Sequence, residues 1–94
     1  MSDKTENVVF IGQKPPMSYV MAVFEIVNKG IKEIVLKARG RAISRAVDVA
    51  EIARTKVMKD KVEVGEIVTG TEMIESRDRG KFSVSTVEIT LKVI

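Results

Sequence analysis

The alternation of apolar and polar positions divides the chain into six predicted elements. Short apolar runs at residues 7–11 and 34–38 have the length and composition of buried strands. Apolar residues at helical spacing predict helices over about residues 17–29 and 41–58. Period-two alternation begins at residue 62 and continues, after a polar turn at 76–80, in a long strand over about residues 82–93. The predicted order is therefore βαβαββ.

Individual residues define the ends and the irregularities of these elements. Pro16 suits the first helical position, where a missing N–H costs nothing, and Gly30 is typical of the residue after a helix. Gly65 stands where the alternation of the third strand changes phase, which predicts a β-bulge. The expected inner faces are Met17, Val20, Met21, Phe24 and Val27 in the first helix, and Ile43, Ala46, Val47, Ala50 and Val57 in the second.

The element order predicts an α/β (α+β) fold in two layers. Right-handed crossovers would place both helices on one face of a four-stranded mixed sheet. The last two strands would form an extended hairpin that projects beyond the sheet. We find no internal repeat or low-complexity segment in the sequence, so residues 7–94 are expected to form one domain after a flexible N-terminus at residues 1–6.

The composition removes most catalytic chemistry. The 94 residues include no Cys and no His. Disulfides, thiolate nucleophiles, Ser–His catalysis and the commonest metal ligands are therefore excluded. The carboxylates alternate on strands or mark outer faces, without a convergent pair. We expect a non-enzymatic protein without a cofactor or a metal site.

The positive charge is concentrated in the middle of the chain. Residues 37–61 hold eight cations and three anions, whereas the whole chain has a net charge of only +3. A local excess of this kind is the electrostatic footprint of a polyanion-binding surface.

The junction between the second strand and the second helix holds the densest part of this charge. Its candidate phosphate-binding residues are Lys37, Arg39, Gly40, Arg41 and Arg45. The first turn of a helix offers unpaired N–H groups and a partial positive charge, which together favour anions. No acidic residue lies between positions 34 and 46. These features favour phosphate binding over an ordinary solvated cluster.

The loop that follows the first strand, residues 12–16, would on its own be a plain connection. If the first two strands are parallel neighbours, however, this loop emerges at the same sheet edge as the basic junction. Gln13 and Lys14 would then lie beside the arginines. The spacing of a P-loop is absent, so nucleotide hydrolysis is not supported.

The turn of the predicted hairpin carries Arg77, Arg79 and Lys81. These residues are either an ordinary charged turn or a basic arm that reaches a nucleic-acid groove, and the sequence leaves both readings open. The chain has three Phe, one Tyr and no Trp. So few aromatic residues argue against a base-stacking platform for single strands.

Three stretches resemble the archaeal Alba chromatin proteins. The first is the run Asn7-Val8-Val9-Phe10-Ile11-Gly12 with Lys14-Pro15, Met17 and Tyr19-Val20. The second, residues 37–54, is similar to the most distinctive signature of that family, and the third is Val84-Ser85-Thr86-Val87-Glu88-Ile89. Together they extend over nearly the whole chain.

The resemblance implies a fold like the C-terminal domain of translation initiation factor three. It also implies a homodimer that binds double-stranded DNA, and RNA as well, with little sequence preference. Such a protein would coat and compact DNA in the cytoplasm, at the chromosome. Its central body would contact the phosphate backbone, and its hairpins would reach along the minor groove.

The sequence departs from that family at a few positions. Gln13 replaces a lysine that is a target of reversible acetylation, which leaves Lys14 as the matching cation. Val57 stands where relatives often carry a Phe that helps dimers associate along DNA, so this higher-order association stays open. Pro16 and Lys59 replace an apolar residue and a proline.

Two alternative functions remain. The protein could be an RNA-binding accessory subunit in RNA processing, as in ribonuclease P-like assemblies, or a phosphometabolite-binding protein or enzyme. A membrane partner is not expected, because no apolar run is long enough to cross a bilayer and the first residues resemble no signal peptide. By default this predicts an intracellular protein.

Overall fold

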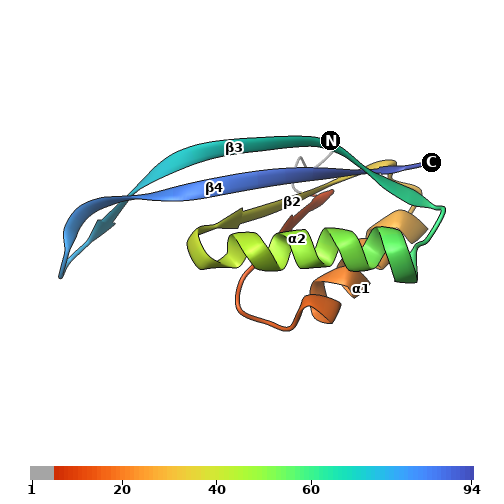
Figure 1. The fold of residues 1–94 in the computed structure, drawn as a ribbon, viewed down its shortest axis with the longest axis horizontal. Helices are drawn as coiled ribbons and strands as arrows, with labels where there is room; N and C mark the ends of the chain where they lie inside the picture. Colours follow the sequence, from red (N-terminus) through yellow and green to blue (C-terminus); the bar gives the residue numbers. More distant parts are fainter. Residues whose placement is uncertain (1–5) are drawn as a thin grey trace.

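The computed structural model describes residues 6–94, which form two layers: a four-stranded sheet and two helices on one of its faces (Figure 1). The elements are β1 (Val8–Phe10), α1 (Pro16–Asn28), β2 (Glu33–Arg39), α2 (Ile43–Ile52), β3 (Val62–Ser76) and β4 (Gly80–Val93). The predicted fold class and element order are confirmed. The flexible start expected at residues 1–6 lies, apart from Glu6, outside the described residues.

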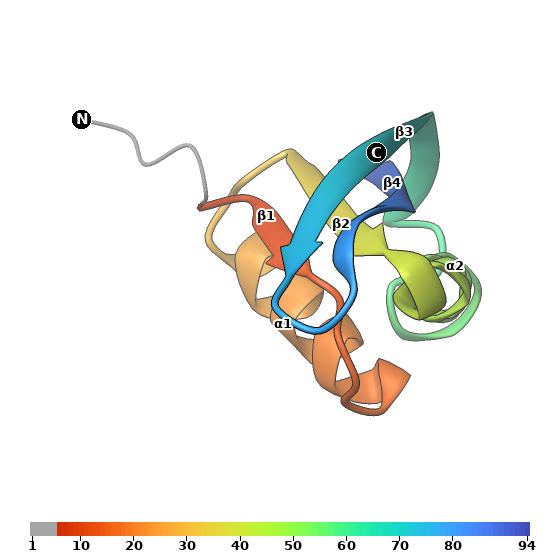
Figure 2. The same cartoon turned by 90° about the vertical axis from the view of Figure 1, so that its left-hand side faces the viewer.

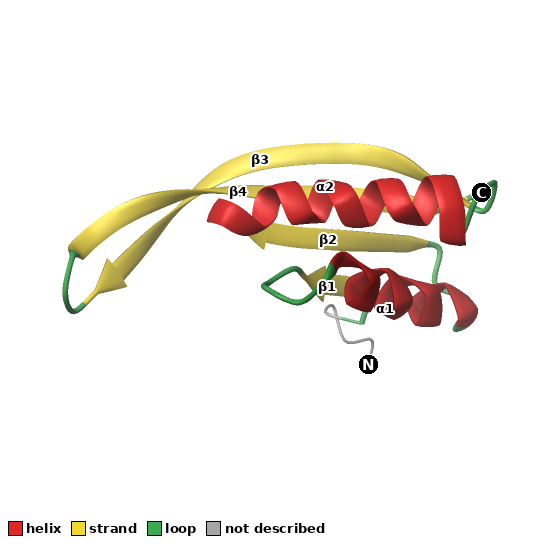
Figure 3. Cartoon of the chain, turned by 60° about the horizontal axis from the view of Figure 1, so that its bottom comes forward, coloured by secondary structure: helices red, strands yellow, loops and turns green. Residues whose placement is uncertain are grey.

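The strands lie in the order β1-β2-β4-β3. β1 pairs with β2 in parallel, while β2 pairs with β4 and β4 with β3 in antiparallel fashion. Both helices lie on the same side of this mixed sheet, as the right-handed crossovers predicted (Figure 3). Among the described residues, none of the helices covers the opposite face, which we call the open face.

The second helical segment has the predicted extent but contains three kinds of turn. A 3₁₀ turn at Gly40–Ala42 precedes α2, and a π-helical turn at Ala53–Val57 follows it. The Thr55 hydroxyl donates a 2.5 Å hydrogen bond to the carbonyl of Glu51, the acceptor that a regular turn would assign to the Thr55 N–H. This competition favours the wider final turn.

The core lies between the helices and the sheet. Its fully covered side chains include Val20 and Val23 from α1, Ala46 and Val49 from α2, and Ile34, Leu36 and Leu91 from the sheet. The alanines of α2 let its backbone lie close to β2 and β4. Apolar burial of this kind is the main stabilising contribution to the fold.

The predicted inner faces of the helices were partly wrong. Met17, Met21, Val47 and Val57 are 37–48% exposed, whereas Val23, Ile26 and Val49 are buried. Each helix contacts the sheet along one stripe, and the apolar face of α1 is wider than that stripe. The sequence pattern predicted how wide the apolar face of α1 is. It did not predict which part of that face the sheet covers.

The hairpin of β3 and β4 extends well beyond the helices and bends as it does so (Figures 1 and 2). One extra residue of β3 lies between the pairs Val64–Leu91 and Ile67–Ile89, so the bulge predicted at Gly65 is confirmed. Further along, a Cβ on Gly70 would lie only 2.9 Å from Oγ1 of Thr86. A side chain at this position, where the arm leaves the sheet, would therefore require Thr86 to shift.

The corrected face of α1 can be tested by truncating one side chain on each side of it. We expect Ile26→Ala to lower the free energy of unfolding by about 2–5 kcal/mol, because it leaves a cavity in the core. We expect Met21→Ala, on the exposed side, to change it by no more than about 0.5 kcal/mol. Urea denaturation followed by circular dichroism measures both, and equal losses would contradict the assignment.

Candidate nucleic-acid interface

The parallel pairing of β1 and β2 brings two loops to one edge of the sheet. Val8, Val9 and Phe10 pair with Val35, Leu36 and Lys37, so both strands end at the same side. The Ile11 N–H extends the pairing by donating to the Lys37 carbonyl at 2.8 Å. The loop at residues 12–15 and the junction at 39–42 are therefore neighbours, as the sequence predicted.

The Tyr19 hydroxyl fixes the first of these loops. It accepts hydrogen bonds from the backbone N–H groups of Gly12, at 2.9 Å, and Lys14, at 3.1 Å. Because Tyr19 belongs to the first turns of α1, the loop is folded back onto the helix that it precedes. Gln13 and Lys14 are both exposed on this ordered loop. Tyr19 was named from the sequence only within a stretch that resembles a known family, and this role was missed.

Arg45 joins the first turn of α2 to the loop at residues 12–15. Its Nη1 donates a 2.7 Å hydrogen bond from α2 to the carbonyl of Gly12. Arg45 is half-buried, and this hydrogen bond uses one nitrogen of its guanidinium. Arg45 therefore both positions the loop and adds positive charge beside it.

Arg41 is exposed in the 3₁₀ turn one helical turn before Arg45. Gly40, with a φ of +58°, makes the change from extended strand to helix possible, since this conformation is unfavourable for other residues. Within residues 6–94, no carboxylate forms an ion pair with Lys14, Arg41 or Arg45. We call these three residues the basic edge.

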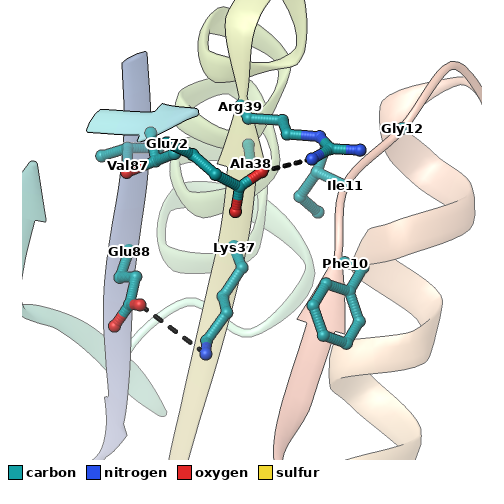
Figure 4. A pocket seen from close by; sticks show the side chains of 10 residues that line it. Phe10, Ile11, Gly12, Lys37, Ala38, Arg39, Glu72, Val87 and Glu88 are labelled. Carbon is teal, nitrogen blue, oxygen red and sulfur yellow. Dashed lines mark hydrogen bonds and ion pairs between the residues drawn. The ribbon is translucent and has the colours of Figure 1, made fainter. Parts of the chain in front are cut away.

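Lys37 and Arg39 differ from the basic edge in having carboxylate partners. The Lys37 ammonium lies 3.6 Å from Glu88 of β4, and the Arg39 guanidinium donates to Glu72 of β3 (Figure 4). Both pairs lie on the open face. The sequence shows no acidic residue near these cations, because their partners are supplied by strands that are distant along the chain.

The structure does not bring the hairpin cations to the basic edge. Arg77 and Arg79 lie in and beside the turn that joins β3 to β4, and Lys81 lies near the start of β4, opposite Glu75. All three are exposed at the end of the projecting arm. They form a second, separate group of cations that only an extended ligand could contact together with the edge.

Arg54 is another cation of residues 37–61, and it forms a local ion pair. Its Nε and Nη2 donate to Glu51 at 2.8 and 2.7 Å, one helical turn earlier. This pairing lowers the pKa of Glu51 and raises that of Arg54. Arg54 lies beyond α2, at the opposite end of that helix from the basic edge, so it does not contribute to it.

The rest of residues 6–94 offers no metal site and no membrane-spanning helix. No group of three or more acidic, His or Cys side chains is arranged to hold a metal ion in this part of the chain. Neither helix in it has the length and hydropathy that a bilayer-spanning segment requires. The chemistry of the basic edge, three cations without a carboxylate partner among these residues, points to an anionic ligand.

Comparison with known proteins gives one family. The model of the family described as Alba matches residues 7–71. The chain is 49% identical over 87 residues to the DNA/RNA-binding protein Alba of Methanocella arvoryzae, which covers 93% of this chain and 90% of that protein. It is 52% identical over 86 residues to the protein of the same name from Methanoculleus marisnigri, with 92% of each chain covered.

Solved structures give the same result. Alba from Thermoplasma volcanium superimposes with a TM-score of 0.85 at 46% identity, covering 92% of this chain and 99% of its own. ALBA1 from Trypanosoma brucei superimposes with a TM-score of 0.77 at 25% identity, covering 97% of this chain and 72% of its own. The two-layer fold is therefore similar along almost its entire length to solved Alba proteins.

The role of Tyr19 can be tested by removing only its hydroxyl. We expect Tyr19→Phe to lower the free energy of unfolding by about 1 kcal/mol, since two backbone N–H groups lose their acceptor. The amide signals of Gly12 and Lys14 in ¹⁵N NMR spectra should move and exchange faster with solvent. Unchanged exchange at both amides would show that the hydroxyl does not order the loop.

Proposed function

The chain belongs to the Alba family, and we propose that it binds double-stranded DNA and RNA without enzymatic activity, through phosphate contacts at the basic edge. The observation that carries this proposal is the hydrogen bond of Arg45 to Gly12, which holds the loop that carries Lys14 against the start of α2, and within residues 6–94 neither cation has a carboxylate partner. The curated relatives, named as DNA/RNA-binding proteins, support the same ligand class.

The geometry of the basic edge suits a polymer backbone better than a small anion. Lys14 and Arg41 are exposed, and the edge is open rather than enclosed. A row of exposed cations gains affinity by displacing condensed counterions from successive phosphates, whatever the base sequence. We therefore expect binding that depends strongly on salt and weakly on sequence.

Lys37 and Arg39 would contribute less to the binding affinity than the three cations of the basic edge. Each must exchange a carboxylate partner for a phosphate, so the attraction to the ligand is offset by the loss of an existing ion pair. Lys14, Arg41 and Arg45 carry no such cost. Gln13 adds no charge, but it lies exposed beside Lys14 and can donate a hydrogen bond to the backbone.

The hairpin extends the proposed contact along the nucleic acid. Arg77, Arg79 and Lys81 lie at the end of an arm that projects past the helices (Figure 1). When a duplex lies on the basic edge, this arm could extend along one of the grooves of the duplex. Contacts at two separated points would make the protein an architectural component that coats and compacts DNA at the chromosome.

We further propose that the binding form is a homodimer. Ile67 is 57% exposed although its cross-strand partner Ile89 is buried beneath α2, so the helical layer ends before it reaches β3. Val47, on α2, is also 47% exposed. A second copy of the chain would cover this side, and two-fold symmetry would double the basic edge into one longer surface. Dimers could then associate along DNA through Val57, which is 37% exposed.

The binding proposal is tested by measuring duplex affinity as a function of salt for the wild type, Arg41→Ala and Arg54→Ala. For the wild type, log K should fall steeply with log salt, by roughly 0.9 per phosphate contact. Arg41→Ala should bind every duplex more weakly. The slope of log K against log salt should be shallower by about 0.9, the value of one phosphate contact. Arg54→Ala removes the same charge at the far end of α2 and should change the slope much less.

Two results would contradict the proposal. Affinity that does not depend on salt would exclude a phosphate-contact mechanism, and equal effects of Arg41→Ala and Arg54→Ala would exclude the basic edge as its location. A structured RNA measured in the same buffer compares the two targets. Clear preference for that RNA over the duplex would favour the accessory role in RNA processing.

The dimer proposal is tested with Ile67→Glu. A carboxylate at the centre of an apolar interface would be desolvated without a partner, so we expect the variant to be monomeric. Light scattering after size-exclusion chromatography should give about twice the 10.4 kDa chain mass for the wild type and the single-chain mass for the variant. A wild-type monomer, or a variant that remains dimeric, would contradict this interface.

A further inference from the structure

The open face of the sheet contains a depression that the basic edge does not use. It has a volume of about 640 Å³ and lies where β1 and β2 end. Phe10 and Gly12 line one side, Lys37 and Arg39 the middle, and Glu72 and Glu88 the other side (Figure 4). The two helices lie on the opposite side of the sheet, so this surface is separate from the core.

Phe10 is the unusual member of this lining. Its side chain is 66% exposed, although its neighbours in sequence, Val9 and Ile11, are only 7% and 6% exposed. The alternation of the strand directs those two residues into the core and Phe10 onto the open face. In Figure 4 the ring lies beside the end of the Lys37 side chain, with the depression next to it. An aromatic ring is thus presented to a ligand rather than buried.

The charges of the depression differ from those of the basic edge. Its two cations and two carboxylates form the pairs Lys37–Glu88 and Arg39–Glu72, so the lining has no net charge. A phosphate would gain little here. A flat group that carries both hydrogen-bond donors and acceptors fits better, because a paired guanidinium and carboxylate line the same depression as an aromatic ring.

We propose that this depression binds an unpaired nucleobase from a single-stranded segment, an inference that rests on the proposed function. The base would stack on Phe10, an interaction that every base can make. Its polar edge would face Arg39 and Glu72, which offer a donor and an acceptor respectively. The site therefore recognises single strands through the base, whereas the basic edge recognises any nucleic acid through the phosphate.

The position of the depression connects the two sites. Gly12 belongs to the loop that Arg45 holds at the basic edge, and it also lines the depression. A strand whose phosphates lie on the edge can therefore place an adjacent base against Phe10 without leaving the protein. A duplex cannot do so, because its bases are stacked and paired inside the helix. The small number of aromatic residues argued against single-strand binding. The exposed position of Phe10 is what makes such binding possible here.

The test compares an unstructured 12-nucleotide RNA with a DNA duplex, using fluorescence anisotropy on the full chain. We expect Phe10→Ala to weaken binding of the single strand by about 5- to 150-fold, the range for losing one stacked base, and to change duplex affinity less than twofold. Phe10→Tyr keeps the stacking surface and should bind the single strand within about threefold of the wild type. Met21→Ala truncates an exposed apolar residue on the other side of the sheet and should affect neither ligand.

The outcomes separate this inference from the proposed function. Loss of single-strand binding in Phe10→Ala, with duplex binding kept and Tyr restoring the single strand, supports the site. Equal weakening of both ligands, or no weakening of either, overturns the site while leaving duplex binding at the basic edge intact. A wild-type protein that binds neither ligand overturns the proposed function and this inference together.

Discussion

The parallel pairing of β1 with β2 is the constraint on which the functional surface depends. It is a short contact of three residue pairs, yet it makes both strands end at one edge of the sheet. Residues 12–15 and 39–42 thereby become neighbours although they are far apart along the chain. Arg45 then closes the arrangement with one hydrogen bond to the Gly12 carbonyl. Without this pairing, Lys14 and the cations that follow β2 would not lie on one surface.

The fold keeps paired and unpaired charges apart. On the open face Lys37 and Arg39 each have a carboxylate from another strand, so these two cations have little long-range attraction for a polyanion. At the basic edge the cations have no such partners among residues 6–94, and they can exchange water and counterions for phosphates. A small net charge is thus compatible with strong local attraction, because the neutralised cations and the available ones occupy different surfaces.

Local patterns in the sequence were enough to predict the elements and much of the edge. Pro16, Gly30 and Gly65 each act within a few residues, and the structure confirms a helix start, a helix end and a bulge at them. Features that depend on distant residues could not be predicted. The partners of Lys37 and Arg39 come from β4 and β3, whose register is shifted by the bulge. The exposure of Met17 and Met21 depends on where the sheet ends.

The central claim, that the two loops form one phosphate-binding surface, is tested most directly by titrating ¹⁵N-labelled protein with a short DNA duplex and following its amide signals. The account predicts the largest shifts at Gly12, Lys14, Arg41 and Arg45, with both loops moving together over the same range of DNA concentration. The account would be contradicted if the signals of these four amides did not move while others did, for example those around Arg54 at the far end of α2.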